Sequence, residues 1–283
     1  MKISYVNGTY VEHEKGVISI DDRGTDFADG VYEVVSYKNR NFIDLEPHLQ
    51  RLDNSLKGLR IDAPLGSNEL KKEIFTLVEK NDIEDGIVYI RITRGAALRD
   101  HPYPANTKPS LVMTVKQWKK PSDEDYKNGV PVITHPEIRW AWRHIKSISL
   151  LPNVIAKQAA VEKNCKEAWF VEKDGTVTEA SSSNVYIVKN NVVITHPTTE
   201  AILGGITRDR LLLLARKNGI KVEERPFTID EALNSDEAFM SSTSVNALPV
   251  NQIDDVKIPV GKIAKKLHEL YEEYIDQIAK QAA

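Results

Sequence analysis

One lysine of this sequence, Lys146, stands in a stretch that is otherwise apolar or small, Ile145–Leu151 (IKSISLL). Lysine is almost never fully buried unless it is paired or used chemically. An amine that loses its hydration favours the neutral form, and a neutral amine is a nucleophile that forms Schiff bases with aldehydes. The alternative is a strand in which Ile145 points inward and Lys146 points to solvent. This stretch by itself leaves both interpretations open.

Three further polar segments could bind a charged ligand. In Thr178–Asn184 (TEASSSN), Glu179 could keep a heterocyclic nitrogen protonated, or it could be an ordinary surface carboxylate in a solvated turn. In Gly204–Asp209 (GGITRD), two glycines precede a predicted helix start, where backbone N–H groups and the helix dipole favour phosphate. A third segment, Ser241–Ser244 (SSTS), places hydroxyl groups at the end of a predicted strand. The last two segments could equally be a capped glycine-rich turn and a polar loop.

An amine, a carboxylate and two phosphate-binding segments are together the groups that hold pyridoxal 5′-phosphate (PLP). The aldehyde would bond Lys146, the pyridine nitrogen would pair with Glu179, and the phosphate would lie at the helix start. The spacing of these residues does not by itself separate this hypothesis from unrelated polar turns.

The elements that must position these residues alternate between strands and helices. A hairpin turning at Asn7-Gly8 opens the chain, and a loop over Asp21–Gly30 leads into the next strand. Ser67 is the predicted N-cap of the second helix. The periodicity predicts strands over residues 3–12, 31–37, 87–95, 110–118, 167–175, 177–188, 192–196 and 237–244, and helices over 46–60, from 67, over 153–164, from 207 to Gly219, and over 261–281.

Length and composition indicate an ordinary globular protein of two domains. We predict a small α+β domain over residues 1–118, a polar linker over 119–129 and a larger α/β domain over 130–283. The net charge is −3, and no basic run, signal peptide or long apolar segment is present, so we expect no nucleic-acid or membrane partner. The single Cys165 excludes an internal disulfide and disfavours a metal cage. We expect a cytoplasmic protein without a bound metal.

The sequence resembles the fold-type IV PLP enzymes, and within them the bacterial D-amino acid transaminases. The resemblance covers nearly the whole chain and implies a two-domain fold whose larger domain is a pseudo-barrel. It also implies a PLP-dependent aminotransferase that moves the amino group of D-alanine-like donors to 2-oxo acids such as 2-oxoglutarate. The motifs that carry it are DRGTDFADGVYEVV, HLQRL, VYIRITRG, LRDHPYP, IKSISLL, TVTEASSSNVY, GGITRD and SSTS.

The resemblance also implies a role for each matching residue. Lys146 would carry PLP as a Schiff base and move the proton, and Glu179 would face the pyridine nitrogen. Tyr32 would lie near the substrate carboxylate, although in an apolar strand it could simply be core packing. Ser182 is a further possible contact. The phosphate would be held by Arg51, Ile206, Thr207, Ser242 and Thr243.

A loop with an Arg-x-His pattern, Arg99-Asp100-His101, indicates which of the family's substrates this protein uses. In the D-specific enzymes, which are homodimers, such a pair binds the substrate α-carboxylate and reaches in from the partner subunit. A guanidinium binds a carboxylate in a bidentate manner, and an imidazole two residues on can add a donor. Without the resemblance, this pattern would indicate only a solvated loop.

A second arginine, Arg91 in Tyr89-Ile90-Arg91, favours a different substrate. Branched-chain L-amino acid transaminases carry a similar Tyr-x-Arg, whose arginine serves the carboxylate. Arg91 could instead pair with an acidic neighbour in the scaffold. Two alternatives of the same fold therefore stay open, a branched-chain L-amino acid transaminase and an aminodeoxychorismate lyase, and the Arg-x-His loop argues against both. A non-catalytic dimeric binding protein is the alternative from another class.

Overall fold

The computed structural model describes residues 2–280, which divide into two compact units. The first unit holds residues 2–118, 145–149 and 278–280, and the second holds residues 119–144 and 150–277. The sequence-based boundaries place residues 145–149 in the second domain, but the structure groups them with the first unit. The reason is main-chain pairing with strand β3 (Gly30–Lys38): Tyr32 N donates to Lys146 O at 2.9 Å, and Ile148 N donates to Gly30 O at 3.0 Å.

The first unit is built on a six-stranded sheet in the order β2-β1-β6-β5-β3-β4. The predicted hairpin is confirmed, because Asn7 and Gly8 both have positive φ (46° and 92°), as a type I′ turn requires. The strands are β1 (Ile3–Val6), β2 (Thr9–Glu12), β4 (Asn41–Phe42), β5 (Gly86–Thr93) and β6 (Ser110–Gln117). A 3-10 turn, η1 (His13–Lys15), follows the hairpin.

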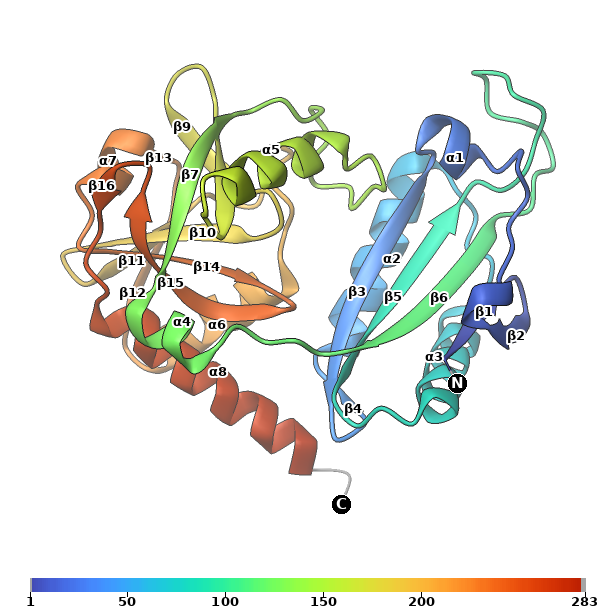
Figure 1. The fold of residues 1–283 in the computed structure, drawn as a ribbon, viewed down its shortest axis with the longest axis horizontal. Helices are drawn as coiled ribbons and strands as arrows, with labels where there is room; N and C mark the ends of the chain where they lie inside the picture. The colour runs from blue at the N-terminus through green and yellow to red at the C-terminus, as the bar shows by residue number, and fades with distance from the viewer. Residues whose placement is uncertain (1, 281–283) are drawn as a thin grey trace. The chain divides into compact units, whose positions relative to one another are not determined.

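Two helices, α2 (Leu45–Leu59) and α3 (Ser67–Asn81), pack their apolar faces against one side of this sheet. Figure 1 shows α2 running alongside β3. Two predictions for this unit are wrong. Ser67 is the first helical residue rather than the N-cap, which is Gly66. The segment predicted as a loop contains a short helix, α1 (Arg23–Phe27), because the Asp22 side chain caps it by accepting from Gly24 N at 2.8 Å.

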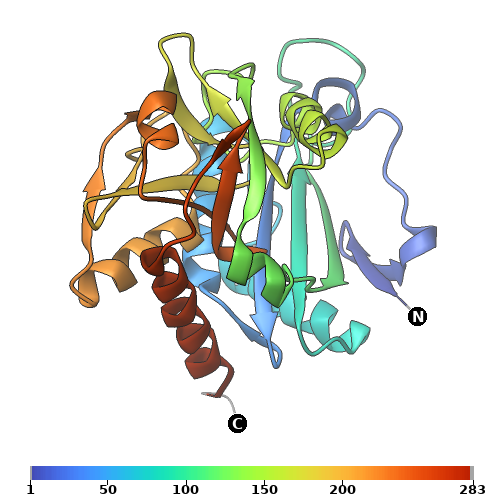
Figure 2. The same ribbon diagram turned by 60° about the vertical axis from the view of Figure 1, so that its left-hand side comes forward.

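The second unit is built on a ten-stranded sheet in the order β12-β11-β10-β14-β15-β7-β8-β9-β13, with β16 beside β15. Strands β9 and β10 are far apart in this order, yet only Ser181–Ser183 join them, and Ala180 N donates to Ser183 O at 2.7 Å. The sheet must therefore curl on itself. Figures 1 and 2 show β7 and β15 side by side. The strands are β7 (Val130–Pro136), β8 (Glu167–Val171), β9 (Thr176–Ala180), β10 (Asn184–Lys189), β11 (Val192–Thr195), β12 (Lys221–Glu224), β13 (Phe227–Thr228), β14 (Glu237–Ser242), β15 (Val245–Ile253) and β16 (Val256–Lys257).

The helices of this unit are α4 (Asp123–Asn128), α5 (Leu151–Glu162), α6 (Ile206–Lys217), α7 (Ile229–Leu233) and all but the last three residues of α8 (Lys262–Lys280). Helix α4 lies in the segment predicted as a linker, where Ser122 and Asp125 form a capping box. Gly219 has φ +74° just past the end of α6, as predicted for the C′ position. The predicted end of the last helix at residue 281 lies outside the described residues. None of the helices within residues 2–280 is long and apolar enough to cross a membrane.

Candidate active site

Lys146 lies on the free edge of β3, in the segment that residues 145–149 add to the first unit. Ser147 pairs with Val31, and Lys146 N donates to Ser55 Oγ of α2 at 3.2 Å. Ile145 is buried in the helix-facing core, while Lys146 is half-buried. Its Nζ lies 3.3 Å from the Tyr32 hydroxyl and 4.3 Å from the centre of the Tyr32 ring. The structure thus brings together the predicted lysine and the predicted substrate-binding tyrosine.

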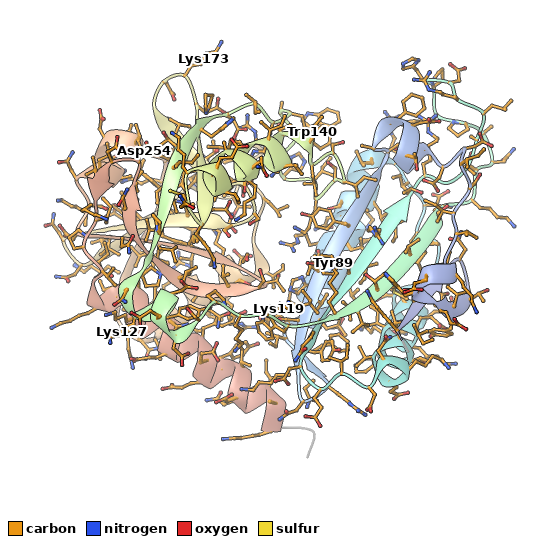
Figure 3. All side chains as sticks on the ribbon, viewed as in Figure 1. Tyr89, Lys119, Lys127, Trp140, Lys173 and Asp254 are labelled. Carbon is orange, nitrogen blue, oxygen red and sulfur yellow. The ribbon has the colours of Figure 1, made fainter. Side chains whose placement is uncertain are left out.

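Tyr32 belongs to the face of the sheet opposite to helices α2 and α3. It stands directly across from Arg91 on β5, and Tyr89 lies two residues along the same strand (Figure 3), so the three side chains share this face. Arg91 is exposed within its unit and lines a cavity of about 400 Å³. Among the described residues, Arg91 forms no ion pair with a carboxylate. The structure therefore does not show the alternative in which Arg91 pairs with an acidic neighbour.

Arg51, predicted to bind the phosphate, lies on α2 and pairs with a carboxylate that the sequence analysis missed. Its Nε and Nη2 donate to the two carboxylate oxygens of Glu33 at 3.0 and 2.7 Å, and His48 Nδ1 lies 3.0 Å from Glu33 Oε1. Burial alone would raise the pKa of Glu33, but the charges and hydrogen bonds of Arg51 and His48 hold that pKa well below its usual range. Burial lowers the pKa of His48, against the opposing effect of Glu33. The ionised Glu33 carboxylate thus holds the Arg51 guanidinium in place.

Arg99 and His101 lie in the exposed loop between β5 and β6. Both side chains contact the Phe27 ring: the Arg99 guanidinium carbon is 5.3 Å from its centre, and the His101 ring centre is 5.5 Å from it. Arg99 Nε is 3.8 Å from Asp26 Oδ1, and the Arg99 side chain is 67% exposed. The two side chains therefore share one side of the loop, as their i, i+2 spacing predicts for an extended segment.

Glu179 is the buried centre of a hydrogen-bond cluster in the second unit. Arg139 Nη1 donates to its Oε1, Asn184 Nδ2 donates to its Oε2 at 3.2 Å, and Leu203 N lies 3.2 Å from both oxygens. Burial raises the pKa of Glu179, while Arg139 and Leu203 N act in the opposite direction. Burial would lower the pKa of Arg139, but Glu179 and Glu137 raise it, so the guanidinium stays charged. Glu179 is therefore not a solvated surface carboxylate.

Asn184 links this cluster to both predicted phosphate segments. It pairs with Ser241 across β10 and β14, and its Nδ2 also donates to Leu203 O at 2.9 Å. A Cβ on Gly205 would lie 2.0 Å from Asn184 Oδ1, so the loop before α6 fits closely around the amide. The first turn of α6 contains Ile206 and Thr207. The N-cap residue, Gly205, has no side chain that could accept from the N–H groups of this turn. In other proteins, N–H groups at this position of a helix bind anions.

The remaining predicted residues lie at the ends of strands. Ser242 ends β14, and Thr243 belongs to the turn before β15, so the predicted strand over residues 237–244 is two residues too long. Ser242 Oγ lies 3.2 Å from Ser244 Oγ. Ser182 Oγ donates to Glu167 Oε2 at 2.5 Å in the turn between β9 and β10. That turn also divides the single strand predicted over residues 177–188 into two.

The sequence analysis missed Glu33, His48, Arg139 and Asn184 as members of these clusters. Asn184 could have been found, because it ends the SSSN motif, and Glu33 directly follows Tyr32 in the DGVYE motif. Arg139 stands 40 residues before Glu179 in a segment without a recognisable motif, and no local pattern connects the two. Ion pairs of this kind depend on how segments that are distant in the sequence pack together.

Residues 30–253 match the family model for amino-transferase class IV, so the chain belongs to this family and is an aminotransferase. The chain is 42% identical over 261 residues to a D-alanine aminotransferase of Bacillus licheniformis, covering 92% of this chain and 91% of the relative. It is 39% identical to a D-alanine aminotransferase of Listeria monocytogenes, covering 96% of both chains. A branched-chain amino acid aminotransferase from T.th., solved in complex with N-(5′-phosphopyridoxyl)-L-glutamate, superposes with a TM-score of 0.88 at 26% identity and covers 98% of this chain and 95% of the other. The predicted fold-type IV architecture is confirmed.

Proposed function

We propose that this protein is a PLP-dependent D-amino acid aminotransferase that moves the amino group of D-alanine-like donors to 2-oxo acids. The observation that carries the proposal is the likeness to D-alanine aminotransferases over more than nine-tenths of the chain. The site residues fit the cofactor. Lys146 supplies an amine beside Tyr32, Glu179 supplies a buried acceptor, and the uncapped start of α6 supplies N–H donors for a phosphate.

The proposed mechanism assigns one task to each of these residues. When bound, PLP supplies an aldehyde that accepts the amino group and a ring that withdraws electrons from the substrate Cα. Lys146 Nζ takes the proton from Cα and returns it to C4′ of the cofactor, and the Tyr32 hydroxyl orients this amine. Glu179, fixed by Arg139 and Asn184, keeps the proton on the ring nitrogen.

Phosphate binding is the proposed task of Arg51, the first turn of α6, Ser242 and Thr243. Arg99 and His101 are proposed to bind the α-carboxylate, which decides which face of Cα presents its hydrogen to Lys146. Because the amino group resides on the enzyme between two half-reactions, the kinetics are ping-pong. The homodimer, in which Arg99 and His101 serve the partner's site, and the cytoplasmic location remain predictions.

A half-reaction without an amino acceptor tests this proposal. The PLP-loaded enzyme is mixed with D-alanine, and separately with L-leucine, and the loss of the visible cofactor band is followed. We expect conversion by D-alanine and not by L-leucine. A band that is absent, or that borohydride does not quench, would refute the assignment of the cofactor.

One observation favours a second candidate, a branched-chain L-amino acid aminotransferase. Arg91 stands directly across from Tyr32, on the same face of the sheet, and its side chain is exposed. An arginine at this place offers the substrate carboxylate a second binding position, apart from Arg99 and His101. Conversion by L-leucine alone, and its loss in Arg91→Gln, would establish this candidate and exclude the first.

A further inference from the structure

A buried ion-pair cluster lies next to the loop that carries Arg99 and His101. At its centre, the Asp29 carboxylate accepts from Arg23 Nε at 2.8 Å, from Arg94 Nε at 2.7 Å and from Arg94 Nη2 at 3.0 Å. Both arginines are more than nine-tenths buried. Buried charges persist only where they are paired and hydrogen-bonded, so this cluster is a fixed part of the unit.

The remaining donors of Arg23 reach the main chain of the loop. Nη1 donates to Asp100 O at 2.6 Å, and Nη2 donates to His101 O at 3.3 Å. Asp100 O and His101 O belong to the two peptide groups on either side of the His101 Cα, and Arg99 is the residue before Asp100. Holding both carbonyls therefore fixes the direction in which the His101 side chain projects and anchors the main chain next to Arg99.

The Phe27 ring adds a second connection between Arg23 and the same two side chains. The Arg23 guanidinium carbon lies 4.6 Å from the ring centre, and Arg99 and His101 contact this ring as well. Phe27 ends helix α1, whose first residue is Arg23. One short helix thus supplies both the main-chain clamp and the ring against which the two side chains rest.

We propose that Arg23 is a positioning residue that sets the affinity for the substrate carboxylate by holding the main chain at Asp100 and His101. This inference rests on the proposed function, in which Arg99 and His101 bind that carboxylate. Arg23 touches no reacting atom, and its side chain is bound to Asp29 and to the loop. Its effect is therefore on binding rather than on the chemical step.

Arg94 provides a matched control, because it shares Asp29, but its remaining hydrogen bonds hold the end of α2 and not the main chain of the loop. Its Nη1 and Nη2 donate to Arg60 O and Leu59 O, both at 2.8 Å, at the end of α2. It stacks on Tyr103 at 3.6 Å, and a lysine at this position can keep a cation over that ring. Arg23→Lys and Arg94→Lys disturb the same carboxylate, but only the first removes the clamp on Asp100 and His101.

The experiment measures the D-alanine half-reaction of the PLP-loaded enzyme over a range of substrate concentrations for the wild type, Arg23→Lys, Arg94→Lys and Arg99→Gln. Each variant is also examined by thermal unfolding and by deuterium exchange of the loop peptide 96–104. We expect Arg23→Lys to raise the apparent Kd for D-alanine by about tenfold, with the saturating rate within about threefold of the wild type. Its loop amides should exchange faster. Arg94→Lys should lower the unfolding temperature by about as much as Arg23→Lys does, but its Kd for D-alanine should stay within about twofold of the wild-type value.

Each other outcome has a defined meaning. If Arg99→Gln raises Kd but Arg23→Lys does not, or if both lysine variants raise it equally, the inference is overturned and the proposed function stands. If Arg99→Gln leaves Kd unchanged, the proposed role of the loop fails, and the inference fails with it. Should Arg23→Lys not fold, Arg23→Gln is measured in its place, because glutamine cannot reach Asp29 and both loop carbonyls at once. An unchanged Kd in Arg23→Gln would also overturn the inference.

Discussion

Replacing Gly205 by alanine should disrupt the hydrogen bonds around Asn184. The backbone at Gly205 (φ −77°, ψ 129°) suits alanine, so the cost is purely steric. The new Cβ would lie 2.0 Å from Asn184 Oδ1, far inside van der Waals contact, and the buried amide must move away. It then loses its bonds to Glu179 Oε2 and to Leu203 O.

The magnitude follows from these two hydrogen bonds. A bond to a charged group contributes about 1.5–3 kcal/mol, and a neutral bond contributes about 0.5–1.5 kcal/mol, so the free energy of unfolding should fall by about 3 kcal/mol. For a chain of this size, that corresponds to a fall of roughly 6–12 °C in the unfolding temperature. PLP affinity should fall as well, because Glu179 loses one of the groups that orient it.

Thermal unfolding followed by circular dichroism, with and without PLP, measures both effects. Gly204→Ala is the matched control in the same loop, because its Cβ would meet only Thr198 Cγ2, at 3.0 Å, at the end of a side chain that can turn. It should change the free energy of unfolding by no more than about 0.5 kcal/mol. An unfolding temperature for Gly205→Ala within about 2 °C of the wild type would refute the claim that Asn184 organises this cluster.

Three further predictions concern the first unit. Lys146→Arg should reduce transamination by about 10⁴-fold and abolish borohydride trapping of the cofactor, because arginine offers no primary amine beside Tyr32 to form the Schiff base or to carry the proton. Trapping at the wild-type level would contradict this. Glu33→Gln should cost about 3 kcal/mol in urea unfolding at pH 7, since it breaks a buried pair with Arg51, and an unchanged urea midpoint would exclude a structural role for the pair. Because the pKa of Glu33 is lower in the folded protein, ionised Glu33 stabilises the fold above the unfolded-state pKa of about 4.3, and this stabilisation is lost as the pH falls toward the folded-state pKa. Below about pH 4.3, the wild type should therefore lose stability more steeply than Glu33→Gln. Parallel pH profiles of the two proteins would refute the assignment.

Much of the local structure could be predicted from the sequence because its causes are local. Asn7-Gly8 specifies a tight hairpin turn through positive φ values, and Gly219 ends a helix for the same reason. The alternation along β5 places Tyr89 and Arg91 on one face and Ile90 on the other, and the helix periodicity locates α2 and α8 to within about a turn. The family motifs then connect Lys146 and Glu179 with the cofactor.

The sequence could not show what each functional residue is bonded to, because those partners come from distant parts of the chain. Glu33 reaches Arg51 only once β3 lies on α2, and Arg139 meets Glu179 from a segment 40 residues away. The place of Lys146 is the clearest case. Its segment follows the second unit's first strand, β7, in the chain, yet its main chain pairs with β3 of the first unit.

The sequence by itself therefore determined the chemical groups available to this protein: an amine, a carboxylate, two turns proposed to bind phosphate and an Arg-x-His loop. Only the tertiary structure decided how these groups are held: Tyr32 against the amine, Asn184 against Glu179, and Arg23 against the loop. The physical reason is that residue types and their periodicity act over a few residues, whereas the pairing of buried polar groups is set by which strands and helices pack together.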